Sequence, residues 1–321
     1  MEFSRAVDLI NKSENISIIP HLSADGDALG SAFSFKLMLE RLGKKAKVYL
    51  EEEIQKRYIF VLDGFEYEII DTEEKAKEIK SDLAIAVDCA DEERMGARKS
   101  IFQNAEKTIL IDHHQFNPGF GDINFVDVKW AATVIGVFEI VKTAGCEMDD
   151  KMANLLYIGL VTDTGGFRHT NTNPQAHMMA AELMKYNVNS ASVSRNVFDN
   201  ITYGRYMLNG EIAKRAEFFF GGKVCMCFLP KEVFDECKAD EEDGEGIVDY
   251  LRNIENVEVS VYIREKNDGL KISLRANDYV DVACIAANFS GGGHIRASGA
   301  SWDGNYEELK RELLKQLEAV I

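Results

Sequence analysis

The chain has 321 residues, of which 46% are apolar, and its 37 basic and 54 acidic side chains give a formal net charge of −17. This length exceeds the usual size of one domain, so two domains are expected. So acidic a surface should repel long polyanions, which argues against tracking along duplex nucleic acid.

The sequence also argues against a membrane protein and against a disulfide-stabilised one. No apolar stretch approaches the roughly 18 residues that span a bilayer, and the first residues carry charges where a signal peptide is apolar. The 6 cysteines contain no Cys-x-x-Cys pair, which favours buried, reduced thiols over a structural zinc site. We therefore expect a cytoplasmic protein without a membrane partner.

Apolar runs alternate with helix-period stretches in the first half of the chain, and this pattern is typical of a mostly parallel sheet flanked by helices. The predicted strands are 16–20, 46–50, 83–88 and 108–112. The predicted helices include 28–42, 131–144 and 152–160.

The second half of the chain begins with a polar, helical stretch from about 175 to 200. Strand-rich segments and a last helix then follow, at 216–220, 223–229, 257–264, 270–275 and 306–321. An acidic stretch at 240–245 is predicted to be a solvated loop.

The predicted fold class is therefore α/β, with an N-terminal mostly parallel sheet flanked by helices and a smaller mixed α/β C-terminal domain. A helical linker joins the two. We expect the first domain at 1–188, the linker at 189–208 and the second domain at 209–321.

Acidic and histidine side chains gather where the predicted strands of the first domain end. Because the carboxyl ends of parallel strands meet at one edge of a sheet, these side chains are expected to lie together. A further aspartate, Asp163, ends a predicted helix in the segment GLVTDTGG. The candidates at the strand ends are His21, Asp25, Asp27, Asp88, Asp112, His113 and His114.

Several carboxylates in one place are costly unless cations neutralise them, so a metal site is the favoured interpretation. The alternative is local structure, in which Asp27 caps a helix that begins at Ala28. Carboxylates with some imidazole and no placed thiolate suit Mn²⁺ or Mg²⁺ better than structural zinc. Cys89 follows Asp88 directly and should point to the opposite face of the strand.

A glycine-rich segment in the second domain, FSGGGHIRASGA at 289–300, is a candidate anion site. Gly292 and Gly293 let the backbone approach a ligand, and His294, Arg296 and Ser298 add donors. The alternative is a flexible hairpin. Arg275, at the end of a predicted strand, is a second candidate for binding phosphate, although arginines at such positions are more often surface residues.

Five segments in this order, HLSADGDALGS, AVDCAD, IDHH, GLVTDTGGFRHTNT and GGGHIRASG, make the chain resemble the DHH phosphoesterase superfamily. The superfamily is named for the motif at 112–114, and the segment at 291–294 resembles its DHH-associated C-terminal domain. The resemblance covers nearly the whole chain. The compact two-domain form is similar to the branch of oligoribonucleases, or nanoRNases, that also act as phosphatases on 3′-phosphoadenosine-5′-phosphate (pAp).

The resemblance implies a role for each candidate residue. Two divalent cations are implied, Mn²⁺ first and Mg²⁺ as the other option, with Asp88 bridging them. The first ion would be held by His21, Asp25 and Asp88, and the second by Asp27, Asp88, His113 and Asp163. The catalytic group would comprise Asp88, His114 facing the scissile phosphate, and Asp112 orienting its neighbours. The substrate would be bound by Arg275, Gly292, Gly293, His294, Arg296 and Ser298.

The implied activity is hydrolysis of short oligoribonucleotides such as pApA, of pAp, or of both, by attack of a hydroxide that bridges the two ions. The expected partners are short RNA or small adenine nucleotides, and a homodimer is left open.

Other functions remain open from sequence alone. They are a cyclic di-AMP or pApA phosphodiesterase, an inorganic pyrophosphatase or polyphosphatase, a RecJ-type single-strand exonuclease, and a nucleotide-binding protein without turnover. The nucleotide-type glycine segment disfavours the pyrophosphatase, and the acidic charge balance disfavours the exonuclease.

Overall fold

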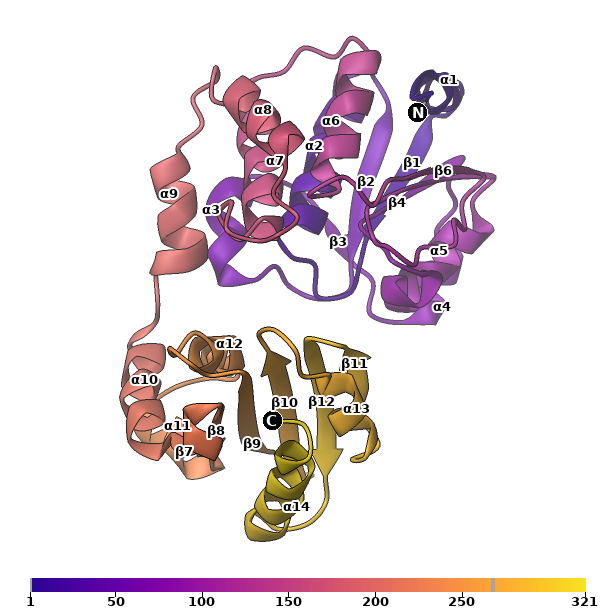
Figure 1. The fold of residues 1–321 in the computed structure, drawn as a ribbon. Helices are drawn as coiled ribbons and strands as arrows, with labels where there is room; N and C mark the ends of the chain where they lie inside the picture. Colours follow the sequence, from indigo (N-terminus) through magenta and orange to yellow (C-terminus); the bar gives the residue numbers. More distant parts are fainter. Residues whose placement is uncertain (1, 267–268) are drawn as a thin grey trace. The chain divides into compact units, whose positions relative to one another are not determined.

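The structure is a computed structural model that describes residues 2–266 and 269–321. The chain divides into two compact units, Met1–Asn200 and Ile201–Ile321. Each unit is built on its own six-stranded sheet (Figure 1).

The sheet of the first unit is parallel throughout, with strand order β3-β2-β1-β4-β5-β6. The strands are β1 Asn15–Pro20, β2 Lys45–Leu50, β3 Glu68–Ile69, β4 Leu83–Val87, β5 Lys107–Asp112 and β6 Ile123–Val126. The predicted fold class and its central strands are confirmed. Sequence analysis missed β3 and β6, which lie at the edges and are too short to show a clear apolar pattern.

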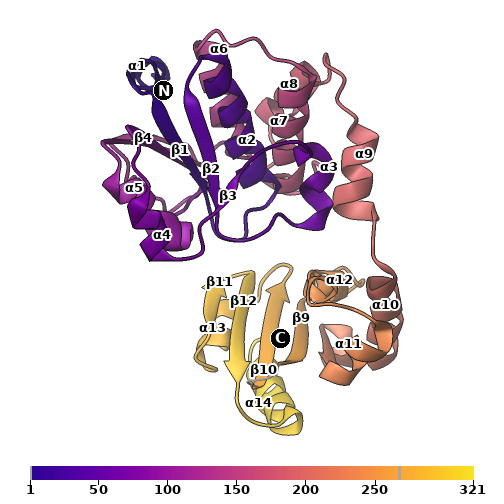
Figure 2. The same ribbon diagram turned by 180° about the vertical axis from the view of Figure 1, so that it is seen from behind.

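Helices cover both faces of this sheet (Figures 1 and 2). The helices are α1 Ser4–Lys12, α2 Gly26–Arg41, α3 Ile59–Leu62, α4 Glu73–Glu78, α5 Lys99–Asn104, α6 Val134–Thr143, α7 Asp150–Asp163, α8 Pro174–Leu183 and α9 Ser190–Ser194. Short helical turns are η1 Lys56–Tyr58, η2 Glu92–Arg98 and η3 Arg195–Asp199. Alternate residues of β4 face two cores: Ile85 packs on the side of α2, α6 and α7, and Ala86 packs on the side of α5. Cys89 lies in this second core, as expected, with its thiol pKa raised by burial.

Helices α2 and α7 pack closely and antiparallel, and two glycines permit it. A Cβ atom at Gly30 would overlap the carbonyl oxygen of Leu155, and one at Gly159 would lie 3.1 Å from Oδ1 of Asp27. The close approach brings the first turn of α2 beside the last turn of α7. The sequence pattern alone does not reveal this packing.

The second unit contains a mixed sheet with strand order β11-β12-β10-β9-β8-β7, in which only β8 and β9 pair in parallel among the described strands. The strands are β7 Glu217–Phe219, β8 Val224–Leu229, β9 Val259–Lys266, β10 Gly269–Ala276, β11 Gly292–His294 and β12 Ala297–Trp302. The helical segments are α10 Tyr203–Arg215, η4 Phe220–Gly222, α11 Lys231–Cys237, η5 Glu242–Gly244, α12 Ile247–Arg252, α13 Val282–Ala287 and α14 Tyr306–Glu318.

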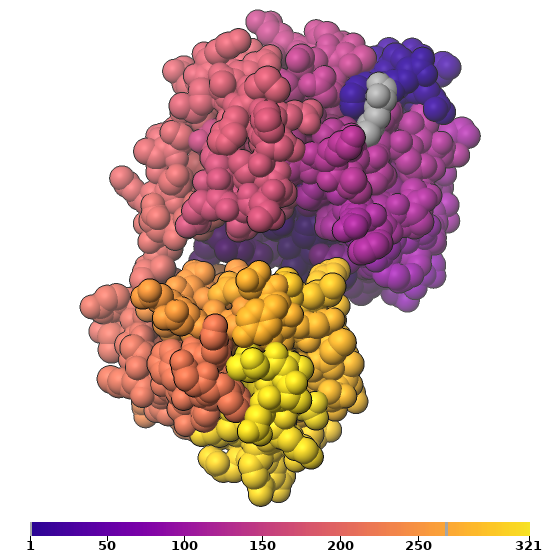
Figure 3. All heavy atoms as spheres, in the orientation of Figure 1, coloured from indigo at the N-terminus to yellow at the C-terminus, as the bar shows by residue number. Residues whose placement is uncertain are grey.

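One face of this second sheet packs against α13 and α14, and α14 lies at the surface of the unit (Figure 3). Leu270, Ile272 and Leu274 of β10 point into that core. The opposite face is covered over β8 and β9 by α10, α11 and α12. Because side chains alternate along a strand, Ser273 and Arg275 point away from the α13–α14 core.

The acidic stretch at 240–245 differs from the solvated loop that the sequence predicted. Asp243 is only 7% exposed, and its carboxylate accepts hydrogen bonds from the Thr202 hydroxyl and, at 3.0 Å, from the Asp240 backbone N–H. The loop is thereby tied to the residue that precedes α10.

Within the described residues, no helix combines the length and apolar character needed to cross a membrane.

Candidate metal centre

Seven of the predicted site residues converge at one edge of the parallel sheet. His21 follows β1, Asp88 follows β4, and His113 and His114 follow β5, while α2 and α7 contribute from the side. Asp27 lies in the first turn of α2, and Asp163 is the last residue of α7. The seventh, Asp25, directly precedes α2.

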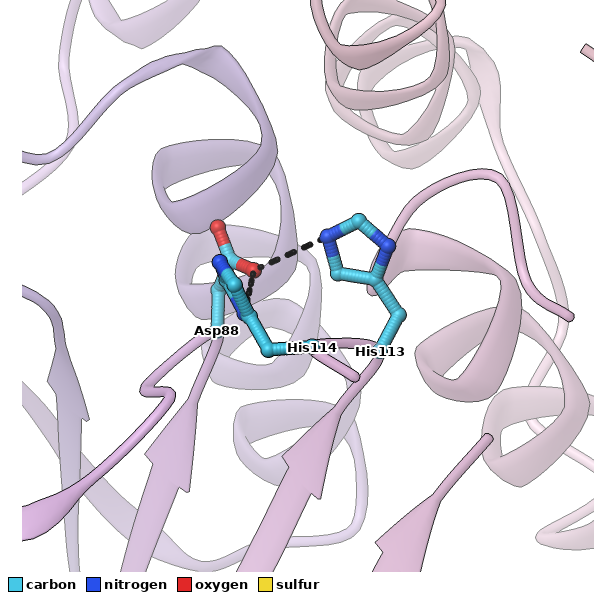
Figure 4. A group of neighbouring side chains, drawn as sticks. All are labelled: Asp88, His113 and His114. Carbon is cyan, nitrogen blue, oxygen red and sulfur yellow. Dashed lines mark ion pairs between the residues drawn. The ribbon is translucent and has the colours of Figure 1, made fainter. Parts of the chain in front are cut away.

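Asp88 lies at the centre of this group and is 3% exposed. Its Oδ2 is 3.5 Å from Nε2 of His21, and its Oδ1 is 3.6 Å from Nε2 of His113 and 3.8 Å from Nδ1 of His114. Figure 4 shows the Asp88 carboxylate reached by both histidines from the end of β5. The backbone of Asp88 has a φ of +59°, a region in which aspartate and asparagine are enriched among non-glycine residues.

Three groups of side chains could each hold a metal ion. The groups are His21, Asp25 and Asp88; Asp27, His113 and Asp163; and Asp88, His113 and His114. The first group contains the residues that the resemblance assigned to the first ion. The second contains those assigned to the second ion except Asp88, which the third group places with His113 and His114.

Burial and the close approach of several carboxylates shift the pKa values of the side chains in this cluster. Burial, with the charges of Asp88 and Asp163, raises the pKa of Asp27 well above its usual value. Burial, with the charges of Asp88 and Asp25, raises the pKa of Asp163 to about 8. Although burial lowers the pKa of His21, hydrogen bonds and charges from Asp25 and Asp88 outweigh it and raise that pKa to about 10.

The donor set fits divalent cations. Oδ2 of Asp163 is buried and accepts no hydrogen bond within the described part of the chain, although Nε2 of His113 lies 3.2 Å away. Cations would neutralise the carboxylates that now raise one another's pKa values. Oxygen and imidazole ligands without a thiolate match the preferences of Mn²⁺ and Mg²⁺.

The capping alternative for this segment is wrong in its detail. The N-cap residue of α2 is Asp25, which accepts hydrogen bonds from the backbone N–H groups of Asp27 at 2.9 Å and Ala28 at 3.1 Å. Asp27 points across to another helix, where both of its carboxylate oxygens accept backbone hydrogen bonds from Thr133 and Val134. The helix therefore begins at Gly26, earlier than the predicted start.

Asp112 orients His114 directly. Its carboxylate is fully buried and accepts a 2.7 Å hydrogen bond from Nδ1 of His114 and a 2.6 Å bond from the side chain of Asn117. That hydrogen bond raises the pKa of His114, whose side chain remains 44% exposed. This arrangement leaves the other ring nitrogen, Nε2, available to bind a ligand. Sequence analysis missed Asn117, whose amide also donates to the carbonyl of Cys89.

Thr133 is a second residue that sequence analysis missed. It is fully buried before α6, and it joins two of the carboxylates. Its backbone N–H donates to Oδ2 of Asp27, and its hydroxyl donates to Oδ1 of Asp88 at 2.9 Å. A threonine before a helix is an ordinary capping signal, so only the three-dimensional contact reveals this role.

Replacing Thr133 with valine is expected to weaken metal binding about 10- to 100-fold, because hydrogen bonds to metal-binding carboxylates orient them. Titration calorimetry with Mn²⁺ measures the effect. Thr133→Ser keeps the hydroxyl and should restore most of the affinity. Equal metal affinity in the valine variant and the native protein would contradict this role.

In the second unit, some of the predicted substrate-binding residues already form hydrogen bonds or ion pairs within the protein, and others are exposed. Arg275 pairs through Nε with Asp249 at 3.4 Å, and His294 is exposed on the edge strand β11. Arg296 donates to the carbonyls of Asp278 and Val280. The Ser298 hydroxyl donates to the carbonyl of Val282 at 2.6 Å, and both Gly292 and Gly293 are exposed in β11.

Comparisons with known proteins match both units. The model of the DHH family, N-terminal domain, matches residues 15–160, and the model of the DHHA1 domain matches residues 221–321. The chain belongs to the DHH family. It is 34% identical over 95% of its length to a Thermus thermophilus protein, of which 89% is covered, named bifunctional oligoribonuclease and PAP phosphatase NrnA.

Two further proteins extend the comparison. A Bacillus subtilis protein of the same name is 26% identical, with 92% of each chain covered. The crystal structure of an exopolyphosphatase-related protein from Bacteroides fragilis has the same fold, with a TM-score of 0.89 and 24% identity over 99% of this chain and 97% of that one. As a member of the DHH family, the chain is a hydrolase that acts on phosphoester bonds, and the family depends on divalent metal ions.

Proposed function

We propose that this DHH protein is a Mn²⁺-dependent enzyme that hydrolyses short oligoribonucleotides such as pApA and the nucleotide pAp. The observation that carries the proposal is the position of Asp88, whose two oxygens face different histidines at the ends of two strands. The names of the related proteins, which cover nearly the whole chain, support the choice of substrates.

In this proposal one group of side chains would hold the first ion and another would hold the second, and Asp88 would contribute to both. The first group is His21, Asp25 and Asp88. The second is Asp27, His113 and Asp163, joined by Asp88, whose Oδ1 lies 3.6 Å from Nε2 of His113. Bound cations would supply the positive charge that activates water for attack on phosphorus and offsets charge on the phosphoryl oxygens.

His114 acts on the substrate rather than on the fold. Because Asp112 holds its Nδ1, the Nε2 of this half-exposed ring is left to donate a hydrogen bond to the scissile phosphate. Asp112 is therefore a positioning residue. Asn117 fixes the Asp112 carboxylate from a second direction.

In the second unit, Arg275 and His294 bind a phosphate group of the substrate. Gly292 and Gly293 allow a ligand to approach the backbone of the exposed edge strand. Arg296 holds the loop before α13, and Ser298 holds the first residue of α13, through hydrogen bonds to backbone carbonyls.

The test is product analysis by chromatography. The purified protein is incubated with Mn²⁺ and, in separate reactions, with pApA, pAp, cyclic di-AMP and pyrophosphate, each with a chelator control. We expect chelator-sensitive release of AMP from pApA and pAp. His114→Ala should lower kcat for both about 100-fold or more, since a positioned proton-transferring or hydrogen-bonding group contributes roughly that factor. Turnover of pyrophosphate alone, or of cyclic di-AMP alone, would contradict the proposal.

A further inference from the structure

The loop at 277–280, which follows β10, is held from two sides by charged side chains. The Glu258 carboxylate, 5% exposed, accepts hydrogen bonds from three successive backbone N–H groups of this loop, at 3.1, 2.8 and 2.9 Å. Arg296 donates to the carbonyls of Asp278 and, at 2.7 Å, Val280. The backbone on both sides of Tyr279 is therefore fixed, because its polar groups are paired with buried or half-buried charges.

Tyr279 itself is 51% exposed. Burying a carboxylate to organise a loop is costly unless its hydrogen bonds are satisfied, as they are here. Within this loop Val280 packs into the core, whereas the neighbouring Tyr279 does not. The arrangement thus fixes the backbone that carries an exposed aromatic side chain. An aromatic side chain on a fixed backbone suits recognition, because the backbone loses little conformational entropy when a partner binds.

Two strands place the side chains proposed to bind phosphate near this loop, and a third strand lies between them. In the sheet register, Arg275 of β10 is opposite Ala297 of β12, and Ala297 is opposite His294 of β11. Residues directly opposite in neighbouring strands point to the same face, so Arg275 and His294 flank the small side chain of Ala297. We call Arg275, Ala297 and His294 the phosphate row.

The backbone of the loop that carries Tyr279 adjoins the phosphate row. Arg296 precedes Ala297 and binds the carbonyls on both sides of Tyr279. Ala276, next to Arg275, donates from its backbone N–H to the carbonyl of Arg296 at 3.1 Å. A positive charge, a histidine and an exposed ring thus share one end of the sheet, with Asp249 offsetting part of the Arg275 charge.

We propose that Tyr279 is a specificity-determining residue that stacks on the nucleobase of a nucleotide whose phosphate lies on the phosphate row. This inference rests on the proposed function and deepens it, because it assigns base recognition to one ring. Aromatic rings bind bases of single-stranded nucleic acid by stacking, and stacking accepts every base. The ring therefore selects nucleotides over phosphate compounds without a base, such as pyrophosphate.

The test compares KM for pApA with KM for an abasic analogue of the same dinucleotide. Tyr279→Ala should raise KM for pApA roughly 5- to 150-fold, the factor that stacking of one base contributes, and leave kcat and the abasic KM unchanged. Tyr279→Phe should behave like the native protein. Phe218→Ala is the matched control, because Phe218 is 53% exposed and lies on β7 at the opposite edge of the same sheet.

A direct binding measurement separates this proposal from the proposed function. Tyr279→Trp should bind pApA with quenching of its tryptophan fluorescence. Equal KM values for pApA in Tyr279→Ala and the native enzyme would overturn the stacking role while leaving the activity intact. If the native protein turned over no nucleotide, the proposed function would fail, and quenching of the Tyr279→Trp variant by pApA, or its absence, would still decide the stacking role.

Discussion

Asp88→Asn is expected to lower kcat/KM for pApA by at least about 1,000-fold. Asp88 is shared by the two proposed ion sites, and metal ions contribute several kcal/mol of transition-state stabilisation, each 1.4 kcal/mol of which is a factor of about ten. Asparagine also tolerates the positive φ of this position, so the substitution removes charge without forcing the backbone to move. Initial rates of AMP release measure the effect.

Asp91→Asn is the matched control for this variant. Asp91 lies three positions along the chain and belongs to none of the candidate metal groups in the described residues. It accepts a hydrogen bond from the backbone N–H of Arg94 at 3.0 Å, which asparagine can also accept. The activity of Asp91→Asn should stay within about twofold of the native value, because substitutions at the surface usually have small effects. Native activity in Asp88→Asn would show that the shared carboxylate is not needed.

Removing divalent cations is expected to abolish turnover and to lower thermal stability. Because the ligand cluster exists only in the folded state, binding at 100 times Kd should stabilise the protein by about 2.7 kcal/mol for each ion. For a unit of about 200 residues this corresponds to a rise in Tm of at least roughly 5 °C. Differential scanning fluorimetry of chelator-treated protein with and without Mn²⁺ measures it, and added Mn²⁺ should restore activity.

Asp88→Asn tests whether the stabilisation comes from this cluster. The variant should show a clearly smaller rise in Tm with Mn²⁺ than Asp91→Asn does. The same rise in both variants would assign the stabilising ion to another place in the chain. Parallel titrations with Mg²⁺ would show whether Mn²⁺ is the preferred ion, as we propose.

The sequence by itself determined the fold class and most of the residues at the candidate metal centre. Parallel strands that are buried on both faces read as apolar runs, and polar residues that break such runs stand out, as Asp88 and His113 do after β4 and β5. Because ligands bind at the carboxyl ends of parallel strands, we could predict that these segments lie close together. The ordered set of motifs specified the family, which the comparisons confirm.

Only the tertiary structure revealed the residues that hold this centre and the loop at 277–280 in position. Thr133 reaches Asp27 across 106 positions of the chain, and Glu258 reaches the loop at 277–280 across about 20. Neither contact has a signature in local periodicity, because threonine and glutamate are common at helix starts and on surfaces. Which residues distant in sequence form a hydrogen bond depends on how the helices and strands pack, as in the close pair α2 and α7. That packing depends on the side chains of the whole core, so no local stretch of sequence predicts it.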